Sequence, residues 1–231
     1  MTSRKIKLNL GQSIELNSLD QMLKITNQIE KSSNEIGDSF KKNSYVPLNL
    51  EIQTMHIGED GASIGVVANK YNEMSSEARW KILEFQKTCV KVRERVHRCQ
   101  INLASCELIN EVIIFFKSEK DVGPINTETE LFLLTKLRDQ YTDITKIEIQ
   151  CLRDEFSAFL NSCQHLKTLS SGLEIVRITG RVEAARIPKQ KQIDDLIKQL
   201  TDFLNLLNNS LNTLELNGRA FRDALSALDR I

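Results

Sequence analysis

Apolar residues recur along this chain at alternating spacings of three and four, with polar residues between them. Such runs extend from Leu19 to Ile57, from Ile64 to Ile113, from Leu134 to Leu173 and from Ile193 to Leu228. A period of about 3.5 residues places the apolar positions of a run on one stripe of a helix that packs against other helices. The pattern therefore predicts four long amphipathic helices.

Capping and turn residues mark the ends of the first predicted helix. Ser18 and Gln21 have the spacing of a capping box, so the helix is expected to begin near residue 18. Residues 1–17 alternate weakly and are interpreted as a lead-in, either a short strand or irregular. Gly58 is the residue type that a helix C-terminus prefers, and Pro47 is expected to kink the helix one or two turns before that end.

The second break in the pattern is longer. Gly123 and Pro124 lie at the centre of a predicted loop over residues 118–126, and Thr127 begins a second capping box that restarts a helix. A phase shift of the apolar stripe near Ile147 predicts a stutter in the third helix. Pro188 is expected to end that helix, because the residue before proline is driven out of helical geometry.

These boundaries predict an all-α fold: an elongated antiparallel four-helix bundle or coiled coil with up-down-up-down topology. Residues 18–117 would form one helical hairpin and residues 127–231 a second, as two pseudo-repeats. The inner two helices are predicted to be longer than the outer two. The turns near Gly58 and Pro188 would then lie side by side at one end.

Composition limits the function classes. Lys plus Arg and Asp plus Glu are equal at 31 each, so no net field draws the chain to nucleic acid or to an anionic membrane. The most apolar run, residues 112–116, is far shorter than the roughly 20 residues that cross a bilayer, and no secretory signal is recognised. The five cysteines have no paired spacing and are interpreted as reduced core thiols. We therefore predict a cytoplasmic protein without membrane insertion.

The chain shows no pattern that carries catalysis. Its three His and five Cys lack chelating spacings, and no nucleophile triad or Gly-rich phosphate loop is present, so we expect no enzyme activity, metal or cofactor. The basic stretch over residues 87–98 is a candidate for nucleic-acid contact. Without interleaved aromatics, and diluted by Glu84 and Glu94, it is better interpreted as a solvated helix face.

The regions around the two predicted turns resemble a known family. The motifs are Leu48-Asn49, Gly58-Glu59-Asp60-Gly61, Val66-Val67-Ala68 and Val182-Glu183-Ala184-Ala185-Arg186. They resemble, at the family's spacing, landmarks at the cytoplasmic tip of bacterial methyl-accepting chemotaxis receptors. A receptor tip is two identical hairpins packed as a four-helix bundle, so the resemblance implies that one polypeptide here contains both hairpins.

The resemblance also implies partners and a binding surface. Receptor tips bind a CheW-type coupling protein and a CheA-type histidine kinase and assemble into arrays. Carried over by position, the partner-binding residues are Leu48, Asn49, Glu59, Ile64, Val66, Val67, Ala68, Glu183 and Arg186. The chain departs from the family where Gln53-Thr54-Met55-His56 replaces Glu-Ala-Ala-Arg and where Pro188 replaces the second Gly-rich turn. Adaptation by methylation is not expected, because the outer helices are too short for the methylated pairs.

The sequence thus predicts a soluble chemoreceptor-like signalling module that binds components of a chemotaxis-type histidine kinase pathway through its hairpin tip. One alternative is a helical scaffold or adaptor with a different protein partner and only an ancestral relation to receptors. A more distant alternative is nucleic-acid binding through the basic stretch, which would depend steeply on salt.

Overall fold

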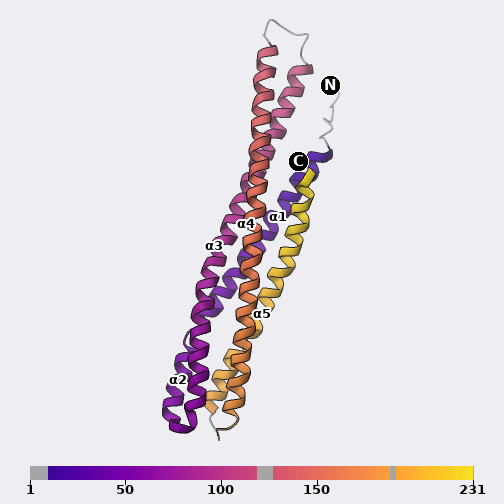
Figure 1. The fold of residues 1–231 in the computed structure, drawn as a ribbon. Helices are drawn as coiled ribbons and strands as arrows, with labels where there is room; N and C mark the ends of the chain where they lie inside the picture. The colour runs from indigo at the N-terminus through magenta and orange to yellow at the C-terminus, as the bar shows by residue number, and fades with distance from the viewer. Residues whose placement is uncertain (1–9, 119–126, 188–190, 231) are drawn as a thin grey trace. The chain divides into compact units, whose positions relative to one another are not determined.

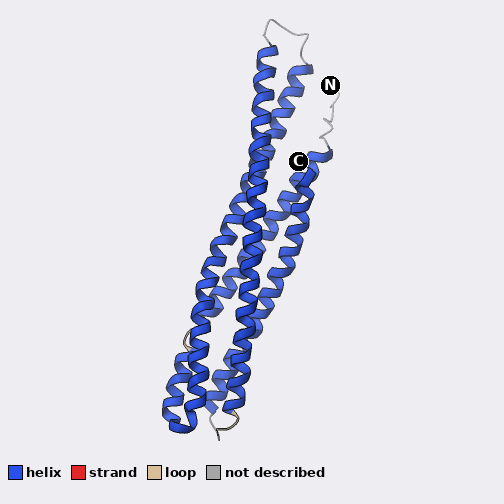
Figure 2. Cartoon of the chain, viewed as in Figure 1, coloured by secondary structure: helices blue, strands red, loops and turns tan. Residues whose placement is uncertain are grey.

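The computed structural model describes residues 10–118, 127–187 and 191–230, and every element in these ranges is a helix (Figure 1, Figure 2). In chain order the elements are α1 (Leu10–Lys42), α2 (Val46–Ile57), η1 (Gly58–Gly61), α3 (Ala62–Ser118), α4 (Thr127–Ala184), α5 (Lys191–Ser226) and η2 (Ala227–Arg230), where η marks a 3₁₀ helix. The predicted all-α class is confirmed, with α1, α3, α4 and α5 as the four long helices.

The first helix begins earlier than predicted. It starts at Leu10, so Ser18 lies inside α1 instead of capping it, and the predicted strand or irregular lead-in is wrong for residues 10–17. Leu10 and Ile14 are four residues apart and lead on to Ser18 and Met22 at the same spacing. This spacing fits a helix as well as the weak alternation fits a strand. Residues 1–9 lie outside the described part of the chain.

Pro47 starts a helix and does not kink one. The first helix ends at Lys42, residues 43–45 form a turn, and Pro47 occupies the first turn of α2. A proline is favoured there because the N–H groups of the first helical residues have no hydrogen-bond acceptor within the helix. The predicted kink is therefore a break between two helices.

The turn at Gly58 is confirmed. Gly58 has a φ of 76°, and η1 connects the end of α2 to the start of α3. The turn is tight: a Cβ on Gly61 would lie 2.6 Å from the carbonyl oxygen of Thr54. The chain therefore folds back closely at this point.

The remaining boundaries agree with the sequence. The second long helix ends at Ser118 and the third begins at Thr127, while the predicted loop centred on Gly123-Pro124 lies outside the described residues. The third helix ends at Ala184, and Ile187 N–H donates to the Ala184 carbonyl at 3.1 Å. Pro188 itself is not described.

The chain forms two compact units, and each takes segments from all four long helices. Unit 1 comprises Met1–Asn27, Lys91–Ser157 and Arg219–Ile231, and unit 2 comprises Gln28–Val90 and Ala158–Gly218. The division cuts across the helices. It does not separate the predicted hairpins 18–117 and 127–231, because both contribute to both units.

Aromatic contacts join the helices of unit 2. Phe40 of α1 meets Phe203 of α5 edge to face with ring centroids 4.7 Å apart. Phe85 of α3 lies 5.2 Å from Phe159 of α4, and both rings are buried. Edge-to-face and offset ring pairs contribute beyond the area that they bury. All four long helices thus share the core of unit 2.

An ion-pair network and a stacked ring pair join the helices of unit 1. Arg95 of α3 donates to Glu148 at 2.6 Å and to Glu155 at 2.8 Å, both on α4. Phe156 of α4 stacks on Phe221 of α5 with centroids 4.3 Å apart.

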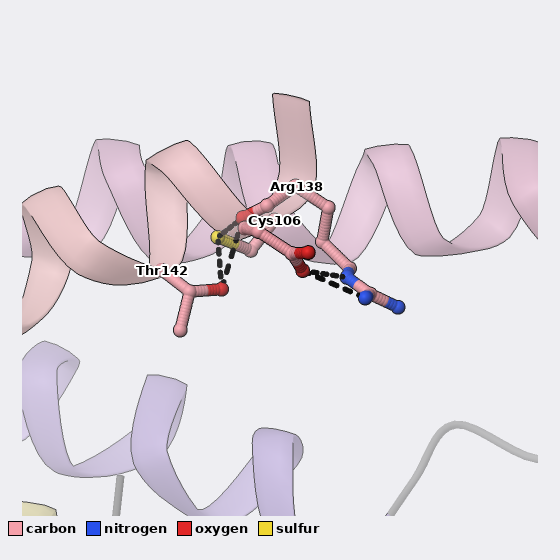
Figure 3. A network of polar contacts seen from close by, with 4 residues as sticks. Cys106, Arg138 and Thr142 are labelled. Carbon is pink, nitrogen blue, oxygen red and sulfur yellow. Dashed lines mark hydrogen bonds and ion pairs between the residues drawn. The ribbon is translucent and has the colours of Figure 1, made fainter. Parts of the chain in front are cut away.

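Farther along the same two helices of unit 1, a thiol bridges α3 and α4. Cys106 Sγ lies 3.9 Å from the Arg138 carbonyl oxygen and 3.7 Å from Thr142 Oγ1 (Figure 3). The Arg138 guanidinium pairs with its neighbour Asp139 at 2.7 Å. The side chains between α3 and α4 here are partly polar.

Candidate functional site

Helix α2 is apolar on two faces. One face is buried in unit 2 and includes Val46, Pro47 and Leu50. The other is a stripe of exposed apolar side chains, spaced three, four and three residues apart, which we call the α2 stripe: Tyr45 (69% exposed), Leu48 (52%), Ile52 (42%) and Met55 (72%). Four large apolar side chains exposed along one helix face are typical of a surface that another protein covers.

The structure divides the first set of predicted site residues. Leu48 and Val66 are exposed apolar side chains, and Asn49 and Glu59 are exposed polar ones, so all four are accessible to a partner. Val66 is 69% exposed and lies one turn into α3.

Three other predicted site residues are buried. Ile64, Val67 and Ala68 are 1%, 7% and 1% exposed, so they belong to the core of unit 2 and not to its surface. Ile64 and Ala68 begin the apolar stripe of α3, and burial of that stripe takes them inside. As packed here these three side chains offer no surface to a partner, and their role in binding stays a prediction.

The second set of predicted residues lies at the end of α4. Arg186 Nη1 donates to both carboxylate oxygens of Glu183, at 3.0 and 3.1 Å. The Arg186 side chain is 70% exposed and that of Glu183 is 17% exposed. An exposed pair of this kind contributes at most about 1 kcal/mol to stability, so the Arg186 guanidinium is available to a partner at little cost.

A shallow pocket joins α2 to the beginning of α5. It has a volume of ≈ 300 Å³ and is lined on the α2 side by Asn49, Ile52 and Gln53. On the α5 side it is lined by Gln192, Asp195, Leu196 and Gln199. Asn49 and Ile52 are thus brought beside a segment of α5 that sequence reasoning did not single out. The glutamine-rich start of α5 was the sequence feature that could have pointed to this pocket.

A second groove, lined by polar and charged residues, lies elsewhere in unit 2, between α1 and α5. It has a volume of ≈ 510 Å³ and is lined by Gln28, Lys31, Ser32, Glu35, Asn209, Ser210, Thr213 and Asn217. Sequence reasoning did not single out this groove, because polar residues on two helices far apart in the sequence give no signal that they face each other.

The thiols of the chain are shielded by burial. Burial raises the pKa of Cys99 and of Cys163 to about 12, so both thiols are protonated and unreactive at neutral pH. All five cysteines are free; Cys89, Cys99 and Cys106 are buried, whereas Cys151 and Cys163 are half-buried. The described residues contain no group of three or more His, Cys, Asp or Glu that could hold a metal ion.

The expectation that the chain does not enter a membrane stays a prediction, and one helix bears on it. By length and composition alone, α3 is apolar enough to do so: an 18-residue stretch of it has a mean hydropathy of 1.3, and 22% of that stretch is buried. The sequence reading considered only the five-residue run at 112–116 and missed the wider apolar stretch around it.

Comparison of the chain with protein-family models, with curated proteins and with solved structures finds no match. The likeness to chemotaxis receptor tips therefore rests on the residues at the two turns.

Proposed function

We propose that this protein is a chemoreceptor-like signalling module that binds a CheW-type coupling protein, or the CheA-type histidine kinase that it serves, through the surface around the α2–α3 turn. The observation that carries the proposal is the α2 stripe, which includes Leu48 of the Leu48-Asn49 motif and ends three residues before Gly58. The function is protein recognition in the cytoplasm, without catalysis.

The proposal includes an antiparallel arrangement of the four long helices as two hairpins. In unit 1, Arg95 of α3 pairs with Glu155 of α4, and Cys106, farther along α3, contacts Thr142, which precedes Glu155 on α4. Contacts that advance along α3 and move back along α4 support opposite directions for the two helices. In unit 2, a Cβ on Gly180 would meet Val67 at 3.1 Å, which supports the end of α4 lying beside the start of α3. A coiled-coil bundle of this kind would bring the two turns together.

The chemistry of the surface supports a protein partner. Leu48, Ile52 and Val66 offer apolar surface. Glu59 and Arg186, each close in sequence to one of the two turns, add a negative and a positive charge. Interfaces combine an apolar centre with a charged rim in this way, and a few central anchors dominate the affinity. Leu48 and Ile52 are the expected anchors.

The test is calorimetric titration of the purified chain with a CheW-type coupling protein and, separately, with the kinase. We expect binding that Val66→Asp or Glu59→Lys weakens at least about tenfold. Leu83→Asp is the matched control, because Leu83 is 52% exposed on α3 in the same unit but lies far along the helix from the turn. Absence of binding by the unaltered chain, or equal losses in the control, would reject the proposal.

A second candidate is a helical adaptor that uses the same surface for an unrelated protein. It is favoured by the burial of Ile64, Val67 and Ala68, which leaves only part of the receptor-like surface accessible. The two candidates differ in the titration: an adaptor would bind neither the coupling protein nor the kinase. Its own partner would still require Leu48 and Ile52.

A further inference from the structure

In unit 1, α3 and α4 continue well past the helices that flank them (Figure 1). Gln100 of α3 donates to Asp20 of α1, and α3 runs 18 residues beyond that contact while α1 begins ten residues before it. At about 1.5 Å per residue, α3 continues for about 12 Å where α1 has ended.

The difference is larger on the side of α5. Phe156 of α4 stacks on Phe221 of α5, and the helical chain after Phe221 ends nine residues later, at Arg230. On α4, Phe156 lies 29 residues after the helix start at Thr127. The third long helix therefore extends about 30 Å farther than α5. We call residues 107–118 of α3 and 127–146 of α4 the α3–α4 arm.

The arm exposes apolar side chains on both of its helices. From Glu128 to Ile144 no side chain of α4 is buried, and Thr145 is the first that is. The exposed apolar residues of the arm are Leu108 (62%), Ile114 (55%), Phe115 (59%), Phe132 (67%), Leu133 (57%), Leu137 (41%) and Ile144 (44%). Several large apolar side chains exposed on two neighbouring helices are typical of an interaction site.

Charge favours a protein over a membrane as the occupant. The arm carries six carboxylates, at residues 107, 111, 128, 130, 139 and 143, and four basic groups, at residues 117, 136, 138 and 146. An acidic surface is repelled by anionic lipid headgroups, which attract basic segments. Glu128 and Glu130 in the first turn of α4 also oppose insertion into a bilayer.

We propose that the arm binds the same arm of a second copy of this chain. Where α1 and α5 support them, α3 and α4 belong to a core shared by four helices. Past the described ends of the chain, Leu10 and Arg230, α3 and α4 retain apolar side chains with neither α1 nor α5 beside them. A second arm supplies two helices, so the pair restores four helices around one core. The contact is isologous, with the same residues contributed by both copies.

The available area predicts a weak dimer. Helices about 10 Å wide, over about 18 Å of α3 and about 30 Å of α4, present a face of about 480 Å². Two such faces bury about 960 Å² in total, below the roughly 1,200 Å² at which stable specific interfaces begin and in the range of transient contacts. The dimer should therefore be transient and dissociate on dilution.

Sedimentation velocity over a hundredfold range of concentration tests the inference on the full chain. We expect a monomer–dimer equilibrium that Phe132→Asp shifts at least about tenfold toward monomer. The matched control is Trp80→Asp, since Trp80 is a ring exposed to a similar extent (60%) in unit 2. Thermal unfolding followed by circular dichroism verifies that both variants are folded. A chain that stays monomeric throughout, or a dimer that Phe132→Asp leaves intact, overturns the inference.

Two further measurements separate this dimer from other occupants. Because the arms are both acidic and the contact is apolar, raising the salt from 50 to 500 mM should leave the dimer unchanged or strengthen it. Loss of the dimer in high salt would overturn an apolar arm contact. If the chain is monomeric and co-sediments with vesicles of zwitterionic lipid, and Phe132→Asp abolishes this binding, the arm binds lipid. This result would overturn the inference that it binds a second copy of the chain. Val66→Asp, near the α2 stripe, should not affect the dimer.

Discussion

The α2 stripe and the α3–α4 arm both expose large apolar side chains, but they differ in what lies beneath them. The α2 helix buries its opposite face, including Val46 and Leu50, against unit 2, so its exposed stripe is held on a packed support. The arm is exposed because its neighbours in unit 1 end first. An apolar surface on a packed support is preorganised for a partner, whereas the arm gains stability of its own only when a partner arrives.

The largest expected effect on stability is the difference between removing a buried ring of α4 and removing an exposed ring of the same helix. Phe159 is 1% exposed and packs on Phe85, so Phe159→Ala should lower the free energy of unfolding by about 3–5 kcal/mol and the Tm by about 10 °C. Phe132 is 67% exposed in the arm, and Phe132→Ala should change the stability by less than about 0.5 kcal/mol. Thermal unfolding at submicromolar concentration, where the arm is unpaired, measures both. Similar losses in the two variants would contradict the comparison.

The next effect concerns the ion pairs that hold α3 to α4 before the arm begins. Arg95→Met leaves Glu148 and Glu155 without their shared cation, and their side chains are only 17% and 23% exposed. We expect a loss of about 1–3 kcal/mol, reduced from the cost at a fully buried site because the groups keep partial contact with water.

Hydrogen exchange gives the readout specific to Arg95→Met. Amides of α3 and α4 in unit 1 should exchange faster in the variant, and those around Phe85 in unit 2 should not change. Uniform acceleration along the whole chain would mean that the two units unfold together and that the arm is no weaker than the rest.

The sequence predicted the elements better than it predicted their surfaces. Gly58 and Thr127 mark helix ends by local backbone chemistry, and the structure places ends at both. Pro47 was misinterpreted because proline is compatible with a kink and with a helix start, and only the turn before it decides between them. The burial of Val67 could not be predicted, since a motif in one helix does not say which side its neighbours cover.

The arm was closer to being predictable. The apolar runs already made the inner helices longer than the outer ones, and an excess of length must leave apolar side chains without partners. The α2 stripe gave a weaker signal, because Tyr45, Ile52 and Met55 lie outside the 3.5-residue stripe and each alone is an ordinary exposed residue. Only the break at residues 43–45 turns α2 into a separate helix with two apolar faces.

A smaller effect tests the rigidity of the turn below the α2 stripe. At Gly58 the φ of 76° with a ψ of −138° is strained for any residue with a Cβ, and no atom lies within 4 Å of the added methyl. Gly58→Ala should therefore cost about 1–2 kcal/mol through backbone strain alone. Gly65→Ala is the control: it lies within α3 and meets Thr54 Oγ1 at an ordinary 3.5 Å, so it should be neutral or stabilising. Equal effects, measured by urea unfolding, would mean that the turn is not strained.

The smallest effect concerns charge in the arm. Burial, with a further contribution from Glu111, raises the pKa of Glu107 above its ordinary value of 4.5, and Glu107 Oε1 is buried with no hydrogen-bond partner. The folded state therefore binds this proton more tightly than the unfolded chain does. The stabilisation is complete below the unfolded pKa and is lost as the pH rises through the folded pKa.

At pH 7 Glu107→Gln should raise the Tm by about 1–3 °C by removing the ionised group, and this advantage should shrink as the pH falls toward 4.5. Glu111→Gln should give part of the gain, because it relieves the repulsion and leaves Glu107 buried. A Tm difference that stays constant from pH 7 to pH 4.5 would show that the variant acts through packing and that the charge is already well solvated in the unpaired arm.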